Sequence, residues 1–290
     1  MQQHGVECDF TDSDSWVILS PIEQSIKRKI EAVGTPLKDW DINIYRGVLT
    51  GYNDAFIIST EKRDEILANC QNEEERKKTA ELIRPILRGR DIKRYGYEWA
   101  DLWIINTHNG VKGKLPRIDV NEYPAIKAHL DQYWDKISKR ADKGETPYNL
   151  RNCAYMEDFN KPKIIYPNMT KYMPFFYDKN AYCTNQKCFI VTGQSMAYLT
   201  AFFNSSLFKF CFRESFPELQ GGTREMSKIF FDKIPVLQVT AEINAKFKSS
   251  VDDIQSEYTK SKAIAIDAMI FDLYNLSERE RQVIGFVEIE

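Results

Sequence analysis

Residues 162–169 read PKIIYPNM, in which two isoleucines and a tyrosine stand between two prolines. A short run of β-branched and aromatic residues bounded by such breakers is typical of a strand. Four further runs have the same character: INIYRGVLTG (42–51), AFIIST (55–60), DLWIINT (101–107) and CFIVTG (188–193). Helical signals occupy the segments around them, namely 61–86, 122–140 and 194–212. The sequence therefore predicts an α+β fold with a mixed α/β middle.

The N-terminal part of this pattern is a single helix that begins after Ser20. Ser20 is a suitable cap, Pro21 fits the first helical position, and Glu23 lies where a capping box places its carboxylate. An apolar stripe follows at helical spacing, made of Ile22, Ile26, Ile30 and Val33. Gly34 ends the helix, so residues 1–35 are predicted to be a linker and a helix.

The C-terminal part is also predicted to be helical. Thr240 can cap a long helix over residues 241–274, which would be about 50 Å long at 1.5 Å per residue. Such a helix would brace a whole domain or pair with the N-terminal helix. The motif SERE (277–280) is a second capping box and opens a short final helix that ends at Gly285. Residues 36–239 are thus the predicted central domain, and residues 240–290 the C-terminal helical segment.

The composition indicates a folded chain without membrane segments. The chain has 290 residues, of which 43% are hydrophobic, and it balances 40 basic against 42 acidic residues. No apolar run approaches the roughly 20 residues that cross a bilayer, and the first residues lack the layout of a signal peptide or anchor. Six cysteines in a chain of this length do not form a disulfide scaffold. We therefore expect a cytoplasmic protein.

The sequence offers little catalytic chemistry. It contains no glycine-rich phosphate loop and no serine nucleophile elbow. Asp91 and Lys93 have the D-x-K spacing of a nuclease metal site, but no accompanying acid stands on a preceding strand and the surrounding cations do not suit a metal. Cys183 and Cys188 are too far apart for a zinc knuckle and have no second pair. The three histidines stand alone and are expected to be ordinary surface or packing residues: His4, His108 and His129.

Six motifs occur in the order seen in one family of DNA-modifying proteins. They are IYRGVLTGYNDAFII (44–58), IRPILRGRDIKRYGYEW (83–99), YPAIKAHL (123–130), KPKIIYP (161–167), LTAFFNSSLFKF (199–210) and IPVLQV (234–239). In this order they resemble the TaqI-like C-terminal specificity domain, and the ending IDAMIFDLYNLSERERQVI (266–284) is also similar to that family. This family supplies the target recognition domain of adenine-specific DNA methyltransferases and of type IIG restriction-modification enzymes.

The resemblance implies a module that reads double-stranded DNA and has no catalytic residues. Adenine methyltransferases of this kind carry an Asn-Pro-Pro-Tyr type motif and a glycine-rich loop for S-adenosylmethionine, and this sequence has neither. The cofactor, and Mg²⁺ if a nuclease is present, are therefore expected on a catalytic part joined in cis or in trans. Two alternatives remain. A type I-like specificity subunit would carry two recognition halves, and no internal repeat is visible. A protein-interaction scaffold would use the long C-terminal helix.

The stretch RPILRGRDIKRYGY (84–97) is the first candidate DNA contact. It holds five cations against one acid, and Gly89 would let the chain leave a helix that ends near Pro85. Four of its cations are expected in a loop that follows a phosphate backbone: Arg88, Arg90, Lys93 and Arg94. The alternative is a set of surface salt bridges to the acids of 73–76, to Glu98 or to Asp101. The favoured interpretation is that Arg90 pairs with Asp91 while Lys93 and Arg94 face DNA.

The second candidate is a hairpin within YRGVLTGYNDAF (45–56). Gly47 and Gly51 permit a tight turn or a close approach to another surface. Arg46 can clamp a phosphate or guanine, and the amide of Asn53 matches adenine in the major groove, with Thr50 as a further donor. Alternatively, the same residues merely form the turn.

The remaining candidates lie in loops. Residues 218–228, ELQGGTREMSK, combine the flexible Gly221 and Gly222 with Thr223 and Arg224, and such a loop either orders in a DNA groove or is a mobile surface loop. Three outlying candidates complete the DNA-binding set: Lys163, Lys171 and Tyr172. The aromatic clusters YMPFFYD (172–178) and AFFNSSLFKFCF (201–212) are expected in the core.

Overall fold

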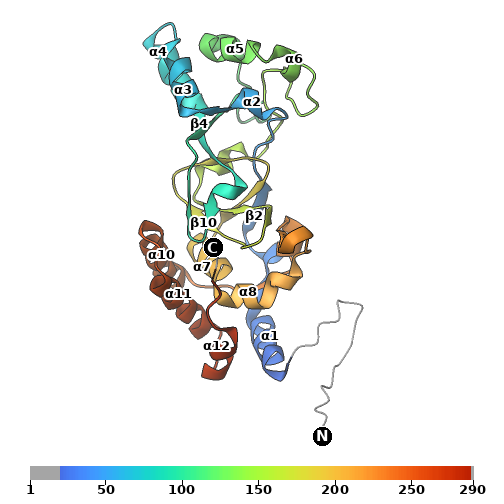
Figure 1. The fold of residues 1–290 in the computed structure, drawn as a ribbon, viewed down its shortest axis with the longest axis vertical. Coiled ribbons are helices and arrows are strands. Elements are labelled where there is room, and N and C mark those ends of the chain that lie inside the picture. The colour runs from blue at the N-terminus through green and yellow to red at the C-terminus, as the bar shows by residue number, and fades with distance from the viewer. Residues whose placement is uncertain (1–19, 289–290) are drawn as a thin grey trace.

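The computed structural model describes residues 20–288, which form an elongated molecule (Figure 1). A β-rich middle separates a group of helices at one end from a larger group at the other. His4 and the predicted linker before residue 20 lie outside the described residues.

The middle is built on an antiparallel four-stranded sheet that contains the run quoted first. Its strand order is β10 (Phe176–Asp178), β8 (Lys163–Pro167), β12 (Cys188–Gly193) and β2 (Ile42–Arg46). Three of the five runs predicted as strands lie in this sheet. The other two supply β3 (Ile57–Ser59) and β7 (Leu102–Ile105), so each of the five runs contains a strand. The α+β prediction is confirmed.

Strand β8 explains why its sequence reads as a continuous apolar run. Every residue of the strand is buried, because the sheet is covered on both faces. Ile164 and Tyr166 point into one apolar cluster, which the helices of the larger end complete, whereas Ile165 points into a second cluster toward the smaller end. Alternation along a strand sends neighbouring side chains to opposite faces. The central sheet thus separates two cores.

The smaller end contains a second sheet and short helices. The sheet has the order β11 (Cys183–Thr184), β4 (Ile83–Leu87), β7 and β3, with β11 parallel to β4 and the other pairs antiparallel. The helices are α2 (Asn53–Phe56), α3 (Thr60–Ala68), α4 (Glu73–Leu82), α5 (Pro124–Asp131) and α6 (Trp134–Ile137).

The larger end is helical and strongly aromatic. Its helices are α1 (Pro21–Val33), α7 (Met196–Asn204), α8 (Ser206–Phe212), α9 (Lys228–Phe231), α10 (Ala241–Ser256), α11 (Lys260–Leu273) and α12 (Glu278–Ile284). Phe175, Phe203, Phe208 and Phe231 are buried, and their ring centroids lie between 5.0 and 6.4 Å apart. The prediction that the phenylalanine-rich clusters are core is confirmed.

Helix ends follow the predicted capping signals closely. The side chain of Ser20 accepts a hydrogen bond from the backbone N–H of Glu23, and the side chain of Ser277 accepts one from the backbone N–H of Glu280. In return, the carboxylate of each glutamate accepts a hydrogen bond from the backbone N–H of its capping serine. Thr240 caps α10 with one hydrogen bond, which its hydroxyl accepts from the backbone N–H of Ile243. These side chains satisfy donors that the first helical turn leaves free.

Two predicted helices are wrong in extent. The helix expected over 241–274 is two helices, α10 and α11, because Thr259 caps a new helix by accepting a hydrogen bond from the N–H of Lys262. The N-terminal helix pairs with α12 instead: Glu280 accepts hydrogen bonds from Ser25 and Lys29 of α1 at 2.8 and 2.7 Å.

The segment 61–86 was also predicted as one helix and is not. It consists of α3, α4 and then strand β4, which pairs with β7. Asn72 caps α4 through the N–H of Glu75, so a new helix starts within the segment. Pro85 therefore lies in a strand, not in the last turn of a helix.

Three two-stranded ribbons complete the fold. They pair β1 (Gly34–Pro36) with β14 (Pro235–Leu237), β13 (Arg224–Glu225) with β9 (Met169–Thr170), and β5 (Ile92–Lys93) with β6 (Gly96–Tyr97). The domain boundaries at residues 35 and 239 stay a prediction. The larger apolar cluster contains residues from both sides of each boundary, such as Ile30, Tyr198 and Phe247.

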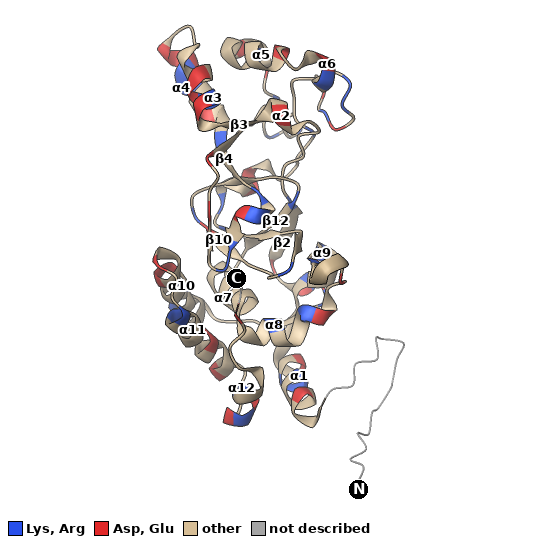
Figure 2. Ribbon diagram, viewed as in Figure 1, with Lys and Arg blue, Asp and Glu red and all other residues tan. Residues whose placement is uncertain are grey.

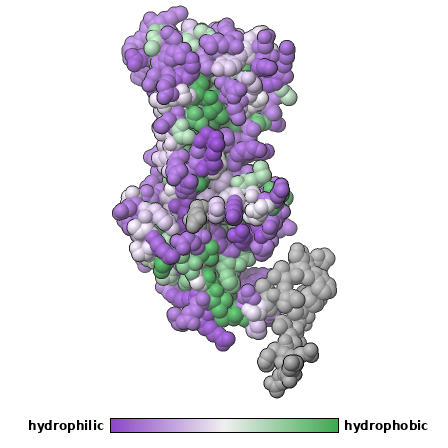
Figure 3. Space-filling view, in the orientation of Figure 1, coloured by the Kyte–Doolittle hydropathy of each residue, from purple (hydrophilic) through white to green (hydrophobic). Residues whose placement is uncertain are grey.

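Charges of both signs are interspersed over the outer helices (Figure 2). The face seen in Figure 3 is mostly hydrophilic, with narrow apolar zones. Within residues 20–288, no helix combines the length and the apolar character that a membrane span requires.

Candidate functional site

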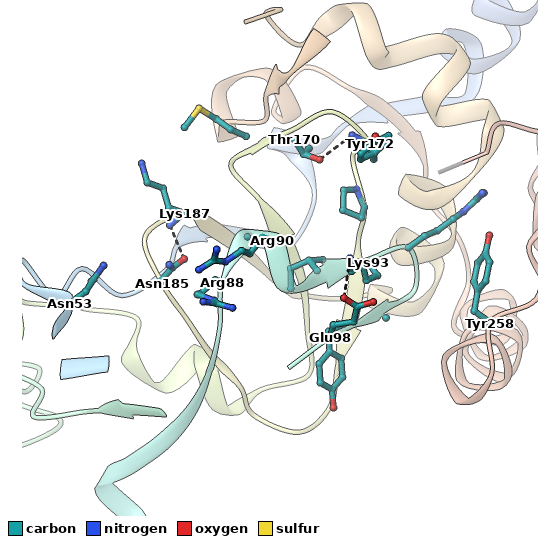
Figure 4. Close-up of a pocket in the computed structure, with 17 residues that line it drawn as sticks. Asn53, Arg88, Arg90, Lys93, Glu98, Thr170, Tyr172, Asn185, Lys187 and Tyr258 are labelled. Carbon is teal, nitrogen blue, oxygen red and sulfur yellow. Dashed lines mark hydrogen bonds and ion pairs between the residues drawn. The ribbon is translucent and has the colours of Figure 1, made fainter. Parts of the chain in front are cut away.

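A groove of about 900 Å³ gathers several of the predicted DNA contacts (Figure 4). Most of its lining comes from the ribbon β5–β6 with the turn before it, and from the 169–174 and 185–187 segments. We call this feature the basic groove. Its lining includes Asn53, Arg88, Gly89, Arg90, Lys93, Glu98, Met169, Thr170, Tyr172, Asn185, Lys187 and Tyr258.

Two cations of the groove are exposed and unpaired. Arg90 follows strand β4 in a short turn of 3₁₀ type, and Lys187 lies in the turn between β11 and β12. Neither side chain forms an ion pair within residues 20–288, whereas surface lysines elsewhere often pair with acids one helical turn away. In Figure 4 they lie near one another on the side of the groove that also holds Asn185. They are free to meet an anion.

Arg88 is held by its own loop. Its guanidinium donates two hydrogen bonds to the buried carboxylate of Asp91, at 3.0 and 2.8 Å, and its backbone N–H donates a third at 2.8 Å. The hydrogen bond to Asp91 raises the pKa of Arg88. Arg88 therefore lines the groove with its guanidinium held by Asp91.

Lys93 makes only a weak pair. Its ammonium lies 3.2 Å from Glu98, and the two side chains are 46% and 77% exposed. Exposed pairs of this kind contribute about 0–1 kcal/mol, so a phosphate can replace Glu98 as the partner of Lys93. The salt-bridge alternative is thus correct for Arg88 and Lys93, but with Asp91 and Glu98 and not with residues 73–76 or Asp101.

Arg94 is a correction. It was predicted to face DNA, but it is 6% exposed, and its guanidinium donates to the carbonyl oxygens of Asn204 and Val287 at 2.8 and 2.9 Å. These contacts tie the β5–β6 ribbon to α7 and to the C-terminal segment. Arg94 is among the residues that line the groove, but both terminal nitrogens of its guanidinium already donate hydrogen bonds within the fold.

Three other predicted contacts are buried as well. Lys163 is 0% exposed and donates to Asp178 at 2.5 Å, because every position of β8 lies between the two cores. Arg224 is 5% exposed and pairs with Glu214 and Glu218 at 2.8 and 2.7 Å. These acids and the carbonyl oxygen of Phe216 accept from the two terminal nitrogens of the guanidinium, and its Nε is buried. Thr50 is 1% exposed.

The expected hairpin at 45–56 does not form. Strand β2 leads into an irregular segment and then α2, and Thr50 donates a hydrogen bond to the side-chain oxygen of Asn53 at 2.6 Å. Asn53 nevertheless lines the groove. Arg46 is exposed, with its Nε donating to the carbonyl oxygen of Gln186 at 2.9 Å, so it lies beside the turn that carries Lys187.

Three of the predicted glycines are closely packed: Gly47 and Gly89 against the 185–187 turn, and Gly51 against Asp142. A Cβ on Gly47 would lie 2.0 Å from the carbonyl oxygen of Asn185, so only glycine lets β2 pass the 185–187 turn. A Cβ on Gly89 would lie 3.1 Å from the carbonyl oxygen of Lys187, which brings the two cation-bearing turns together. Gly51 adopts a φ of +68°, a conformation that glycine tolerates without strain.

The 218–228 loop lies outside the lining of the groove, and its contact with DNA stays a prediction. Gly221 and Gly222 adopt φ values of +74° and +76°, and a Cβ on either would meet nothing within 4 Å. The chain then returns as β13, whose Arg224 and Glu225 pair with Thr170 and Met169 of β9. Thr223 does not line the groove; its carbonyl oxygen accepts from the N–H of Leu219 at 2.7 Å. The loop thus connects to the groove through the pairing of β13 with β9.

Lys171 and Tyr172 lie on the surface, as predicted. Both are exposed, and the Lys171 ammonium lies 5.6 Å from the centroid of the Tyr172 ring. Tyr172 lines the groove. Whether these residues bind DNA stays a prediction, as it does for Arg46, Asn53, Arg88, Arg90 and Lys93.

The sequence reading missed the 185–187 turn and Tyr258. Asn185 accepts a hydrogen bond from the N–H of Lys187 at 3.1 Å, which is the local turn that asparagine favours. The stretch TNQK between two strand-like runs carried that signal. Tyr258 reaches the groove because α10 and α11 are separate, and the prediction of one long helix hid it.

His129, Cys183 and Cys188 are buried. His129 is buried, with Nε2 3.0 Å from the carbonyl oxygen of Ala55, and burial lowers its pKa. Burial likewise raises the pKa of the Cys183 and Cys188 thiols. No group of three His, Cys, Asp or Glu side chains suited to a metal occurs within residues 20–288.

Solved structures share this fold. The type IIG restriction endonuclease BpuSI is similar over 88% of this chain with a TM-score of 0.54 and 14% identity. The type IIL restriction-modification enzyme MmeI, solved in complex with DNA, is similar over 85% of the chain with a TM-score of 0.58 and 10% identity. The chain spans only 33% and 35% of these two proteins. No curated protein sequence matches it.

The sequence profile of the TaqI-like C-terminal specificity domain matches residues 84–236, just over half of the chain. This range contains most of the lining of the basic groove, including Arg90 and Lys187. The chain therefore belongs to the family of TaqI-like C-terminal specificity domains, the DNA target-recognition modules of restriction-modification enzymes.

Proposed function

We propose that the chain recognises one short sequence in double-stranded DNA through the basic groove, on behalf of a catalytic part that methylates adenine. The observation that carries this proposal is the meeting of Arg90 and Lys187, two exposed and unpaired cations from distant segments, in one groove of the matched domain. Arginine and lysine side chains supply most phosphate contacts of DNA-binding proteins. Asn53 and Arg46 lie close enough to this groove to add base contacts.

The catalytic part is the proposed partner in cis or in trans. We propose that it holds S-adenosylmethionine, and Mg²⁺ if it includes a nuclease. The described residues do not fit either group: they contain no glycine-rich loop after a strand and no acid cluster, and the Asp91 carboxylate is already occupied by Arg88. DNA in the cytoplasm is the proposed substrate of the assembly.

The first prediction concerns DNA selection. The purified chain is expected to bind duplex DNA with a dissociation constant of about micromolar, because it lacks the contacts of its catalytic partner. Selection from random duplexes should enrich one short motif, measured by sequencing after repeated rounds of binding. Binding that is lost at moderate salt and enriches no motif would favour a scaffold with an incidental basic loop.

The second prediction concerns chemistry. The chain alone is expected neither to methylate nor to cut duplex DNA in the presence of S-adenosylmethionine and Mg²⁺. The reason is the lack of a base-holding motif and a metal cluster among the described residues. Transfer of a radiolabelled methyl group to the enriched duplex is the measurement, and label in the DNA would contradict the proposal.

A further inference from the structure

The basic groove is not lined by charges alone. Nine large hydrophobic residues are at least 39% exposed within residues 20–288, and three of them line this groove: Met169, Tyr172 and Tyr258. Single exposed apolar side chains need no explanation, but their concentration beside unpaired cations marks a binding surface. In Figure 4 the two tyrosines lie on the side of the groove away from Lys187. The groove thus combines exposed apolar side chains with its cations.

The segment that presents Met169 and Tyr172 is rigid. Met169 and Thr170 pair with β13, and the N–H of Met226 donates to the carbonyl oxygen of Asn168 at 2.7 Å. The Thr170 hydroxyl accepts hydrogen bonds from the N–H groups of Tyr172 and of the next residue, at 3.1 and 3.2 Å. We call residues 169–172 the reading turn. Because its backbone is fixed before binding, little conformational entropy is lost when its side chains meet a ligand.

An apolar surface beside phosphate-binding cations suits one group of duplex DNA. In the major groove, the 5-methyl group of thymine is the one apolar feature among the base edges. Phosphates and sugars attract cations and polar donors, so they give no reason for an exposed methionine and tyrosine. Because the cations and the apolar side chains line the same groove, one DNA duplex can contact both through a phosphate and a neighbouring base edge.

We propose that the reading turn contacts the 5-methyl groups of thymine through Met169 and Tyr172. This inference rests on the proposed function and adds to it which base feature the apolar part recognises. A wedge that unstacks bases is a weaker fit, because unstacking costs a few kcal/mol per step. Lys171 lies over the Tyr172 ring and reduces the area left for stacking.

The test replaces thymine by deoxyuridine, one position at a time, in the duplex enriched by selection with the full chain. Deoxyuridine pairs like thymine and lacks only the methyl group. The wild-type chain is expected to lose about fourfold in affinity at one or two positions, which is the effect of about one buried methyl group. The variant Met169→Ala/Tyr172→Ala is expected to bind the thymine and deoxyuridine duplexes equally.

The matched control is Ile229→Ala, which removes an exposed apolar side chain that does not line the groove. It should keep the full deoxyuridine effect. An enriched site without any A·T pair would overturn the inference, as would equal binding of both duplexes by the wild-type chain. Increased fluorescence of 2-aminopurine in the complex, without a deoxyuridine effect, would overturn it in favour of unstacking. Enrichment of no motif would instead remove the proposed function itself.

Discussion

Replacing Arg90 and Lys187 together with alanine is expected to weaken binding to every duplex sequence by about sixtyfold at about 0.1 M salt, and to lower the salt slope by about two. Each cation that neutralises a phosphate releases close to one counterion, and its loss at this salt costs about eightfold in affinity. Both side chains are exposed and unpaired, so their removal breaks no ion pair of the described residues. Fluorescence anisotropy at a series of salt concentrations measures both quantities.

A charge-matched control separates contact from net charge. Arg76 and Lys77 lie on α4, are exposed, form no ion pair within residues 20–288 and do not line the basic groove. The variant Arg76→Ala/Lys77→Ala also removes one arginine and one lysine, and it should leave the salt slope unchanged. Equal losses in both variants would show that DNA responds to total charge and not to the groove.

The same experiment on the pair that the sequence favoured would mislead. Lys93 and Arg94 are adjacent in a basic stretch, and nothing in their spacing distinguishes them from Arg90. Only the fold shows that Arg94 binds the carbonyl oxygens of Asn204 and Val287, residues far away in the chain. An Arg94 variant would lose affinity through unfolding of the β5–β6 ribbon, and the loss would look like a lost phosphate contact.

The sequence predicted the strands well because their signals are local. A run such as IIYP is apolar at every position and bounded by prolines, so its burial on both faces follows from composition alone. Caps were equally predictable, since Ser20 and Ser277 act on donors three residues away. Helix breaks at Asn72 and Thr259 were missed because each interrupts an otherwise regular pattern, and a single capping residue decides them.

The candidate site was predictable only in part. The sequence identified Asn53, Arg88, Arg90, Lys93 and Tyr172, all of which line the groove. The 185–187 turn joins them through tertiary packing, since Gly47 and Gly89 both press against it. No local signal states that two distant turns will touch. The buried cations were wrongly included for the same reason, because a lysine in a strand looks the same in sequence whether or not an acid faces it.

Lys163 leads to the second large effect. It lies opposite Asp178 in the β8–β10 pair, both side chains are 0% exposed, and the ammonium donates to the carboxylate at 2.5 Å. The variant Asp178→Ala is expected to lower the free energy of unfolding by about 3–5 kcal/mol, because it leaves an uncompensated charge in the core. It also removes the acceptor for the N–H groups of Asn180 and Tyr182. Urea denaturation measures the loss.

The variant Lys163→Met is the control, because it removes the other partner of the same ion pair. It leaves Asp178 with two backbone donors and fills the space with an apolar chain, so it should cost less than Asp178→Ala. Burial lowers the pKa of Lys163, and the Asp178 carboxylate partly opposes this shift. Without the carboxylate the pKa falls further.

Between that lowered pKa of Lys163 and its ordinary value of 10.5, the unfolded state binds more protons than the folded state, so the free energy of unfolding rises with pH. The loss of unfolding free energy in Asp178→Ala, relative to the wild type, should therefore be smaller at about pH 9 than at about pH 7. The loss in Lys163→Met should not decrease in this way. Equal deficits of Asp178→Ala at both values would mean that Lys163 leaves the core or finds another acceptor when its partner is removed. A strongly reduced DNA affinity in a fully folded Lys163→Met protein would contradict the structural role and return Lys163 to the DNA contacts.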